Sequence, residues 1–241
     1  MNKLPNKISP CPIIEAVFEI RFESDLPDDA IFGVIYSVFR EKYRKVEQLP
    51  ILQLPQIVRT QDPNLIYAPH YRLSKENSVI QIGPKIFSLA NVGEYMGWDS
   101  FFKLIEETYS KVENTGVISS LNRIALRYIN IFQEINILDK ADFCASIGGK
   151  SLSDEKINFS AEILAEKSVS QIKIINSAEA VISGKKVTGS IIDIDSSVNL
   201  KEFDDFSSAV QYSHMEEKKL FYKVLGEQFT RTLNPEYWEL R

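Results

Sequence analysis

The spacing of apolar side chains restricts the fold most, because it switches repeatedly between the period of a strand and the period of a helix. Residues 14–23 alternate strictly between apolar and polar, which predicts a half-buried strand. An acidic, proline-containing start at 25–29, followed by apolar residues at helical spacing up to Phe39, predicts a helix next. The chain therefore begins with a strand and a helix.

The region between the two predicted helices is rich in strand-like patterns. The proline-containing segment 48–57 predicts an extended connector, with a short edge strand at 56–59. Residues 67–74 and 78–90 predict a hairpin of two strands, and Gly83-Pro84 predicts a bulge or bend within the second.

A second helix and a long strand complete the first half. Apolar residues recur at helical spacing from Trp98 to Val112, and residues 114–116 end this helix. Residues 117–132 alternate again and predict a strand. The resulting order, strand-helix-strand-strand-helix-strand, is typical of a ferredoxin-like α+β domain, with two helices on one face of an antiparallel sheet.

The second half has a different pattern. A loop over 139–153 is followed by three runs rich in Ile and Val, at 157–165, 168–183 and 186–198. A helix then begins at Asp204 or Ser207 and continues through Thr230, and residues 236–240 add an edge strand or dock as a hook. We therefore expect two α+β halves, 1–138 and 139–241, with the antiparallel meander and last helix packed on the first half.

Composition limits the compartment and the partners. The 28 Lys and Arg residues against 33 Asp and Glu residues give a net charge of −5, which disfavours general binding to nucleic acid or to an anionic membrane. Charges or prolines interrupt every apolar run before it reaches the length of a membrane span, and the N-terminus has no signal-peptide pattern. A cytoplasmic protein is expected, with Cys11 and Cys144 as free thiols.

Gly148-Gly149-Lys150-Ser151 ends like a phosphate-binding P-loop. The motif requires a glycine five positions before Gly149, but Cys144 stands there, and no helix pattern begins at Ser151. The sequence therefore favours a surface loop over a nucleotide site, and we expect no cofactor.

Two histidines, His70 and His214, limit acid–base chemistry that uses imidazole. His70 lies in an extended, partly exposed segment, and His214 shares a helical stripe with Val210 and Phe221. No nucleophile pattern accompanies either histidine, so a structural role is favoured. A weaker alternative is an acid–base or metal site that pairs His214 with Asp193 or Asp195, whose spacing puts both carboxylates on one strand face.

The most informative polar pattern is a charged sheet face. In a ferredoxin-like sheet the strands 14–23 and 117–132 are neighbours, so their outward charges meet away from the helices. The residues expected on this face are Glu19, Arg21, Glu23, Arg123 and Arg127. A cross-strand ion-pair network is favoured over a site for an anionic ligand or partner. The face lacks the stacking aromatics of an RNA-recognition domain.

Several segments together resemble the sporadically distributed family of uncharacterised bacterial and archaeal proteins. They are Pro12-Ile-Ile-Glu-Ala-Val-Phe-Glu-Ile-Arg-Phe22, Ile82-Gly-Pro with Ser88-Leu89, Glu94-Tyr-Met-Gly-Trp98 with Phe101, Arg123-Ile-Ala-Leu-Arg-Tyr-Ile-Asn130, and His214 with Phe221 and Pro235. The resemblance implies a prokaryotic cytosolic protein of scattered occurrence, a distribution often associated with mobile or defence-related loci. It implies no activity, cofactor or catalytic residue.

The sequence leaves three classes of function open. The absence of a convincing catalytic set favours a non-enzymatic protein-binding or accessory module that acts through a protein partner or self-association. The first alternative is an enzyme or small-ligand binder that uses a cleft between the halves, with Arg123, Arg127 and His214 as polar groups. The second alternative is a nucleic-acid-binding protein.

Overall fold

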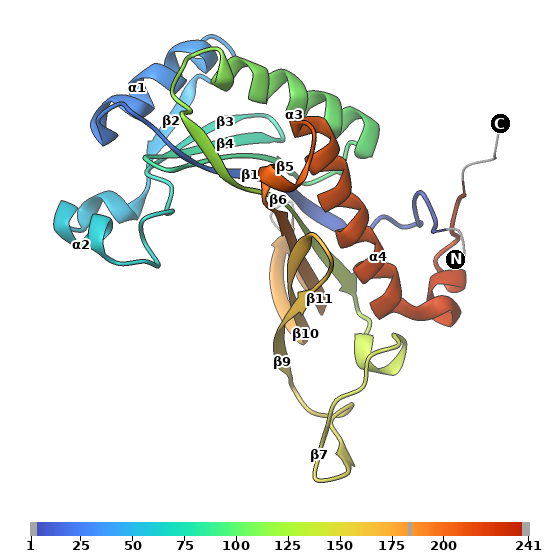
Figure 1. Ribbon diagram of the computed structural model, residues 1–241. Coiled ribbons are helices and arrows are strands. Elements are labelled where there is room, and N and C mark those ends of the chain that lie inside the picture. Colours follow the sequence, from blue (N-terminus) through green and yellow to red (C-terminus); the bar gives the residue numbers. More distant parts are fainter. Residues whose placement is uncertain (1–3, 183–184, 238–241) are drawn as a thin grey trace.

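A computed structural model describes residues 4–182 and 185–237 of the chain. Within these residues a single antiparallel sheet of nine strands runs through both halves in the order β2-β3-β4-β5-β1-β6-β11-β10-β9 (Figure 1). The strands are β1 (Ile13–Glu23), β2 (Lys45–Gln48), β3 (Tyr71–Lys75), β4 (Ser78–Gly83), β5 (Ile86–Val92), β6 (Ser120–Gln133), β9 (Asn158–Leu164), β10 (Ser168–Ile182) and β11 (Lys185–Val198). β7 (Ser146–Ile147) and β8 (Lys150–Ser151) form a separate small hairpin.

Four α-helices lie in the described residues: α1 (Asp28–Phe39), α2 (Gln56–Gln61), α3 (Trp98–Glu113) and α4 (Phe206–Thr232). The chain is therefore α+β, as predicted. α1 and α3 pack on the first half of the sheet, and α4, red in Figure 1, crosses β6 and β11. α4 begins with a capping box in which the Asp205 carboxylate accepts from the Ser208 amide.

The alternation in β1 explains why the helices cover only one face of the sheet. The side chains of Ala16, Phe18, Ile20 and Phe22 are fully buried, whereas their odd-numbered neighbours remain partly exposed. The buried set packs with Ile31 and Ile35 of α1 and with Phe101 and Ile105 of α3. The uncovered face is left for the charged residues.

The two predicted halves share strand pairing rather than meeting face to face. β11 of the second half pairs with β6 of the first, with Asp195 opposite Arg127 and Ile192 opposite Asn130. α4 also joins the halves, because Val210 belongs to the first hydrophobic cluster and Phe221 to the second. The second half thus extends the sheet of the first.

Two predicted strands between the helices were wrong in detail. Residues 56–59 are not an edge strand but part of α2, and the edge strand is β2. A Cβ on Gly83 would lie 2.7 Å from the carbonyl oxygen of Ala68, so only glycine allows this close approach. The predicted strand 78–90 is two strands, because the chain reverses at Pro84 and Lys85 and β4 pairs with β5.

The second half follows its predicted order closely. The three Ile- and Val-rich runs form β9, β10 and β11, and the last helix is α4. The pattern did not predict the interruption at Gly226, where φ is 71° within α4. Glu236 forms an isolated antiparallel bridge with Lys7, while residues 238–240 of the predicted tail and Ser183 of the predicted strand lie outside the described residues.

Candidate functional site

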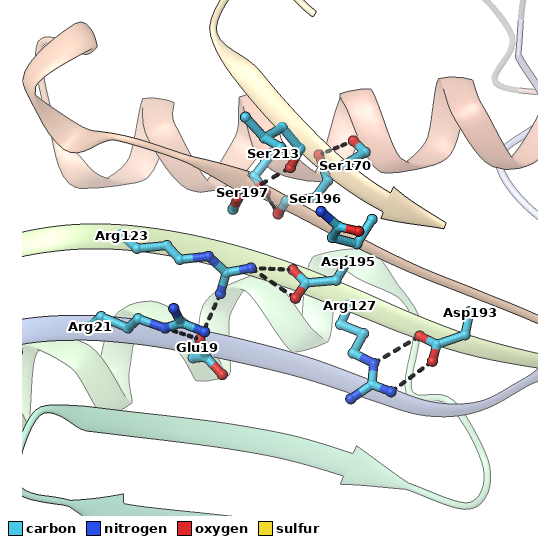
Figure 2. Close-up of polar contacts among 12 residues, drawn as sticks. Glu19, Arg21, Arg123, Arg127, Ser170, Asp193, Asp195, Ser196, Ser197 and Ser213 are labelled. Atoms are coloured by element: carbon cyan, nitrogen blue, oxygen red, sulfur yellow. Dashed lines mark hydrogen bonds and ion pairs between the residues drawn. The ribbon is translucent and has the colours of Figure 1, made fainter. Parts of the chain in front are cut away.

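The structure brings the predicted charged residues together on the face opposite the helices (Figure 2). Arg123 Nη1 donates to Glu19 Oε1 at 2.6 Å, and Arg123 Nη2 lies 2.8 Å from both Asp195 oxygens. Arg21 Nε donates to Glu19 Oε1 at 3.0 Å. Glu19 thus separates two arginines that lie directly opposite each other in the β1–β6 register.

The remaining members of this face are also paired. Arg127 binds Asp193 through two parallel hydrogen bonds of 2.8 and 2.6 Å. Glu23 accepts from Lys85 Nζ at 2.7 Å and from Asn122 at 3.1 Å. The carboxylates therefore neutralise the arginines, and the arrangement is the predicted cross-strand ion-pair network.

The predicted partnership of His214 with Asp193 or Asp195 is wrong. Both aspartates bond the arginines on the open face (Figure 2), whereas Ile192 and Ile194, between and beside them, are buried beneath α4. His214 belongs to α4 and lies on that covered face. Because successive strand residues point to opposite faces, the sheet separates the imidazole from both carboxylates.

Gly148-Gly149-Lys150-Ser151 is not a phosphate cradle. Gly148 and Gly149 both have positive φ and form the exposed turn between β7 and β8. A strand rather than a helix begins at Lys150, so no helix N-terminus faces this turn. The Lys150 amine instead bonds Glu155 at the surface.

A pocket lies on the helix-covered side, between α3 of the first half and α4 of the second. Its volume is about 370 Å³. The N-terminal segment, the start of α3, β6 and α4 contribute its lining. The lining residues used below are Lys7, Cys11, Tyr95, Trp98, Asp99, Tyr128, His214, Glu217, Lys218, Phe221 and Tyr222.

Aromatic rings fix His214 in this pocket. Its imidazole stacks on Trp98, with centroids 3.7 Å apart and planes 7° apart, and the Tyr128 hydroxyl lies 3.2 Å from Nδ1. Burial among these rings, with a smaller contribution from the positive charge of Lys218, lowers the pKa of His214 to about 3. The imidazole is therefore neutral near pH 7.

Glu217 is the charged group most deeply buried in the pocket. Its side chain is 5% exposed, and no hydrogen bond or ion pair from the described residues reaches its carboxyl group. Desolvation raises the pKa of Glu217 to about 8, against a weaker opposing effect of Lys218. At pH 7 this carboxyl is mostly protonated.

Sequence reasoning found His214 but missed Glu217, Tyr95 and Tyr128. A signal for Glu217 was present: it lies three residues after His214 and four before Phe221, so all three share one helix face. An acidic residue on an otherwise apolar stripe indicates either a buried partner or a ligand. The tyrosines had no comparable signal, because Tyr95 stands in a loop and Tyr128 continues the ordinary alternation of a strand.

The described residues hold no group of three or more His, Cys, Asp and Glu side chains that could bind a metal ion. None of their helices is long and apolar enough to cross a membrane. A scan of the chain against models of known protein families finds no match, and a search of curated proteins also finds none.

Proposed function

We propose that this chain is a non-enzymatic binding module and that the pocket between α3 and α4 takes a small organic ligand. The observation that carries the proposal is a cavity of about 370 Å³ whose lining includes several aromatic rings and one buried carboxyl group. Apolar walls with a few polar groups that fix orientation are the usual composition of small-molecule sites. The alternative of a ligand cleft between the halves supports the proposal only in part. Of its three expected polar groups His214 lines this pocket, whereas Arg123 and Arg127 belong to the ion pairs on the opposite face of the sheet.

The polar groups of the pocket favour binding over catalysis. His214 is stacked on Trp98 and hydrogen-bonded to Tyr128, and in the described residues no hydrogen bond links it to Cys11 or Glu217. An imidazole with a pKa of about 3 is a weak general base at neutral pH. A nucleophile paired with a base is the usual mark of covalent catalysis.

We also propose that the first half is a ferredoxin-like domain and that the chain belongs to the prokaryotic family it resembles. The strand order β6-β1-β5-β4, with α1 and α3 on one face, supports a ferredoxin-like first half in which β2, α2 and β3 are additions. We also retain the resemblance to the sporadically distributed prokaryotic family, with the cytosolic location and mobile or defence-related locus that it implies.

Blocking the pocket through Cys11 tests the proposed function. Cys11 is an exposed free thiol on the pocket rim, and Cys144 is an exposed free thiol on the distant loop before β7. We expect a bulky maleimide on Cys11, in a Cys144→Ser background, to weaken fragment binding by roughly tenfold or more. Saturation-transfer NMR with a library of small fragments provides the measurement.

The matched control is Cys11→Ser labelled at Cys144, which should bind the same fragments as the unlabelled protein. If no fragment binds the unlabelled protein, or if both labels have the same effect, the pocket is not a ligand site. Labelling is best done above neutral pH, because burial raises the pKa of the Cys11 thiol.

Docking of a protein is a second candidate function, favoured by apolar residues on and before α2. Ile57 is 62% exposed, and Leu54 and Val58 beside it are about 40% exposed. If this patch mediates self-association, Ile57→Lys should abolish concentration-dependent sedimentation of the wild-type protein, whereas Val38→Lys on α1 should not. A wild-type protein that stays monomeric over a roughly hundredfold concentration range would dismiss self-association.

Nucleic-acid binding gains no support from the charged face. The guanidinium groups of Arg123 and Arg127 already bind carboxylates, so phosphate would have to displace Glu19, Asp193 or Asp195. The arginines would then lose charge-assisted hydrogen bonds to carboxylates and gain hydrogen bonds of similar strength to phosphate.

A further inference from the structure

Within residues 4–182 and 185–237, no hydrogen bond or ion pair reaches the buried carboxyl of Glu217. Lys218, adjacent in sequence, acts on this carboxyl through its charge, but neighbouring helix positions are turned by roughly 100° and the two side chains form no ion pair among those described. The described ion pairs include neither residue, and Lys7 at the pocket bonds Glu236 instead. A carboxyl group this deeply buried, with no hydrogen-bonding partner in the described part of the chain, is available to a ligand in the cavity.

The rings around this carboxyl present faces in different directions. Tyr95 and Tyr128 have centroids 5.8 Å apart and planes at 88°. Phe221 and Tyr222, from α4, are also nearly perpendicular, at 73°. Both pairs are edge-to-face contacts between the rings themselves, and all four rings contribute to the lining of the pocket. The face of each ring carries the negative part of its quadrupole.

We propose that the ligand of this pocket is a small organic cation whose alkylammonium group lies among these rings with Glu217 as its counter-ion. The inference rests on the proposed function and names the ligand class of the same site. Ring faces attract a cation, and an ionised carboxylate completes its neutralisation. The two features act on the same positive charge, so an anion is attracted by neither and a neutral molecule lacks the charge attraction of the carboxylate.

Of the other groups that face the pocket, Lys7 and Lys218 oppose a cation, although the Lys7 amine is bonded to Glu236. His214 is neutral at pH 7 and does not repel a cation. Asp99, at the start of α3, adds a second acidic group to the lining. The titratable or charged groups of the lining are Lys7 and Cys11 from the N-terminal segment, Tyr95 and Asp99 near α3, Tyr128 from β6, and His214, Glu217, Lys218 and Tyr222 from α4.

A pair of probes that differ in charge tests the ligand class. Benzyltrimethylammonium carries the cation on a ring small enough for the cavity, and benzyl alcohol is a neutral counterpart. We expect the wild-type protein to bind the cation more tightly. Glu217→Gln should weaken its binding by roughly tenfold or more while changing benzyl alcohol binding by less than about twofold, measured by calorimetry or NMR titration.

Glu216→Gln is the matched control, because it makes the same change one position earlier on α4. Glu216 bonds Lys219 at the surface, and it does not line the pocket. Both probes should bind this variant as they bind the wild type. Unchanged benzyl alcohol binding in Glu217→Gln also shows that the pocket remains folded.

Proton release provides a second, independent readout. Because the pKa of Glu217 is about 8, a cation that requires its carboxylate must expel a proton at pH 7. Calorimetry in buffers of different ionisation enthalpy should detect nearly one proton released by the wild type and none by Glu217→Gln. The affinity of the wild type for the cation should rise as the pH increases towards 8.

Three results would overturn the ligand class. They are equal wild-type affinity for the two probes, an equal loss of both in Glu217→Gln, or cation binding without proton release. In each of these cases the probes still occupy the pocket, so the proposed function survives. Failure of the Cys11 label to affect any fragment would instead remove the proposed function itself.

Discussion

Glu217→Gln is expected to raise the free energy of unfolding at pH 7 by about 3 kcal/mol, an unusually large gain for one substitution. The carboxyl has a pKa of about 8 when folded, against 4.5 when unfolded. Between these values the folded state holds a proton that the unfolded state has released. Stability therefore falls as the pH rises through this window. Glutamine does not ionise, so the free energy of unfolding of the Glu217→Gln variant does not fall in this way.

The pH dependence distinguishes this cause from a simple packing effect. Urea unfolding should give a difference between Glu217→Gln and the wild type of less than about 1 kcal/mol at pH 5, growing steadily towards pH 8. His214 titrates in the opposite sense: its lowered pKa makes stability fall as the pH drops below 6.5. Both proteins contain His214, so its effect cancels in the difference. A difference that does not depend on pH would mean that Glu217 ionises normally.

The same substitution should therefore stabilise the protein and weaken binding of the cation. A buried carboxyl kept at the expense of stability is what a binding site requires when its ligand supplies the missing charge. An alternative in which Glu217 serves the fold predicts the reverse, a loss of stability. The unfolding measurement and the probe titrations are thus two independent tests of the role of Glu217.

The sequence predicted those parts of the fold that depend on local periodicity. Apolar and polar residues alternate clearly in β1, and apolar residues cluster in β9, β10 and β11. This pattern alone was enough to predict these strands. Glu19 and Arg123 were placed together because strand order followed from the element order. Gly83-Pro84 was interpreted as a bulge or bend within one strand and not as the reversal between β4 and β5, since all of these place glycine and proline within a strand pattern.

The pocket depended on information that periodicity does not carry. The pairing of β11 with β6 brings Arg127 and Asp195 to one face of the sheet. Neither half alone indicates this pairing, so the sequence associated Asp195 with His214 instead. Tyr95 and Tyr128 reach the same cavity from a loop and a strand that are 33 residues apart. Their convergence is a property of the sheet and of α4 crossing it, so only the three-dimensional arrangement reveals the site.

The junction between β6 and β11 gives the second large expected effect. Gly189 lies opposite Gln133 in this pairing, and a Cβ at position 189 would lie 2.2 Å from the carbonyl oxygen of Phe132. Backbone cannot yield as a flexible side chain does, so the strands would have to separate. Ser190 beside it accepts from the Ile137 amide and donates to the carbonyl oxygen of Ile135, and these bonds hold the two halves in register.

Gly189→Ala should therefore lower the free energy of unfolding by about 3 kcal/mol or more, measured by urea unfolding. Gly33→Ala is the matched control, because nothing lies within 4 Å of the Cβ position in the middle of α1. Alanine should stabilise that helix by about 0.5–1 kcal/mol, since glycine loses more backbone freedom on folding. If Gly189→Ala is as harmless as Gly33→Ala, β6 and β11 do not approach this closely and the sheet does not continue between the halves here.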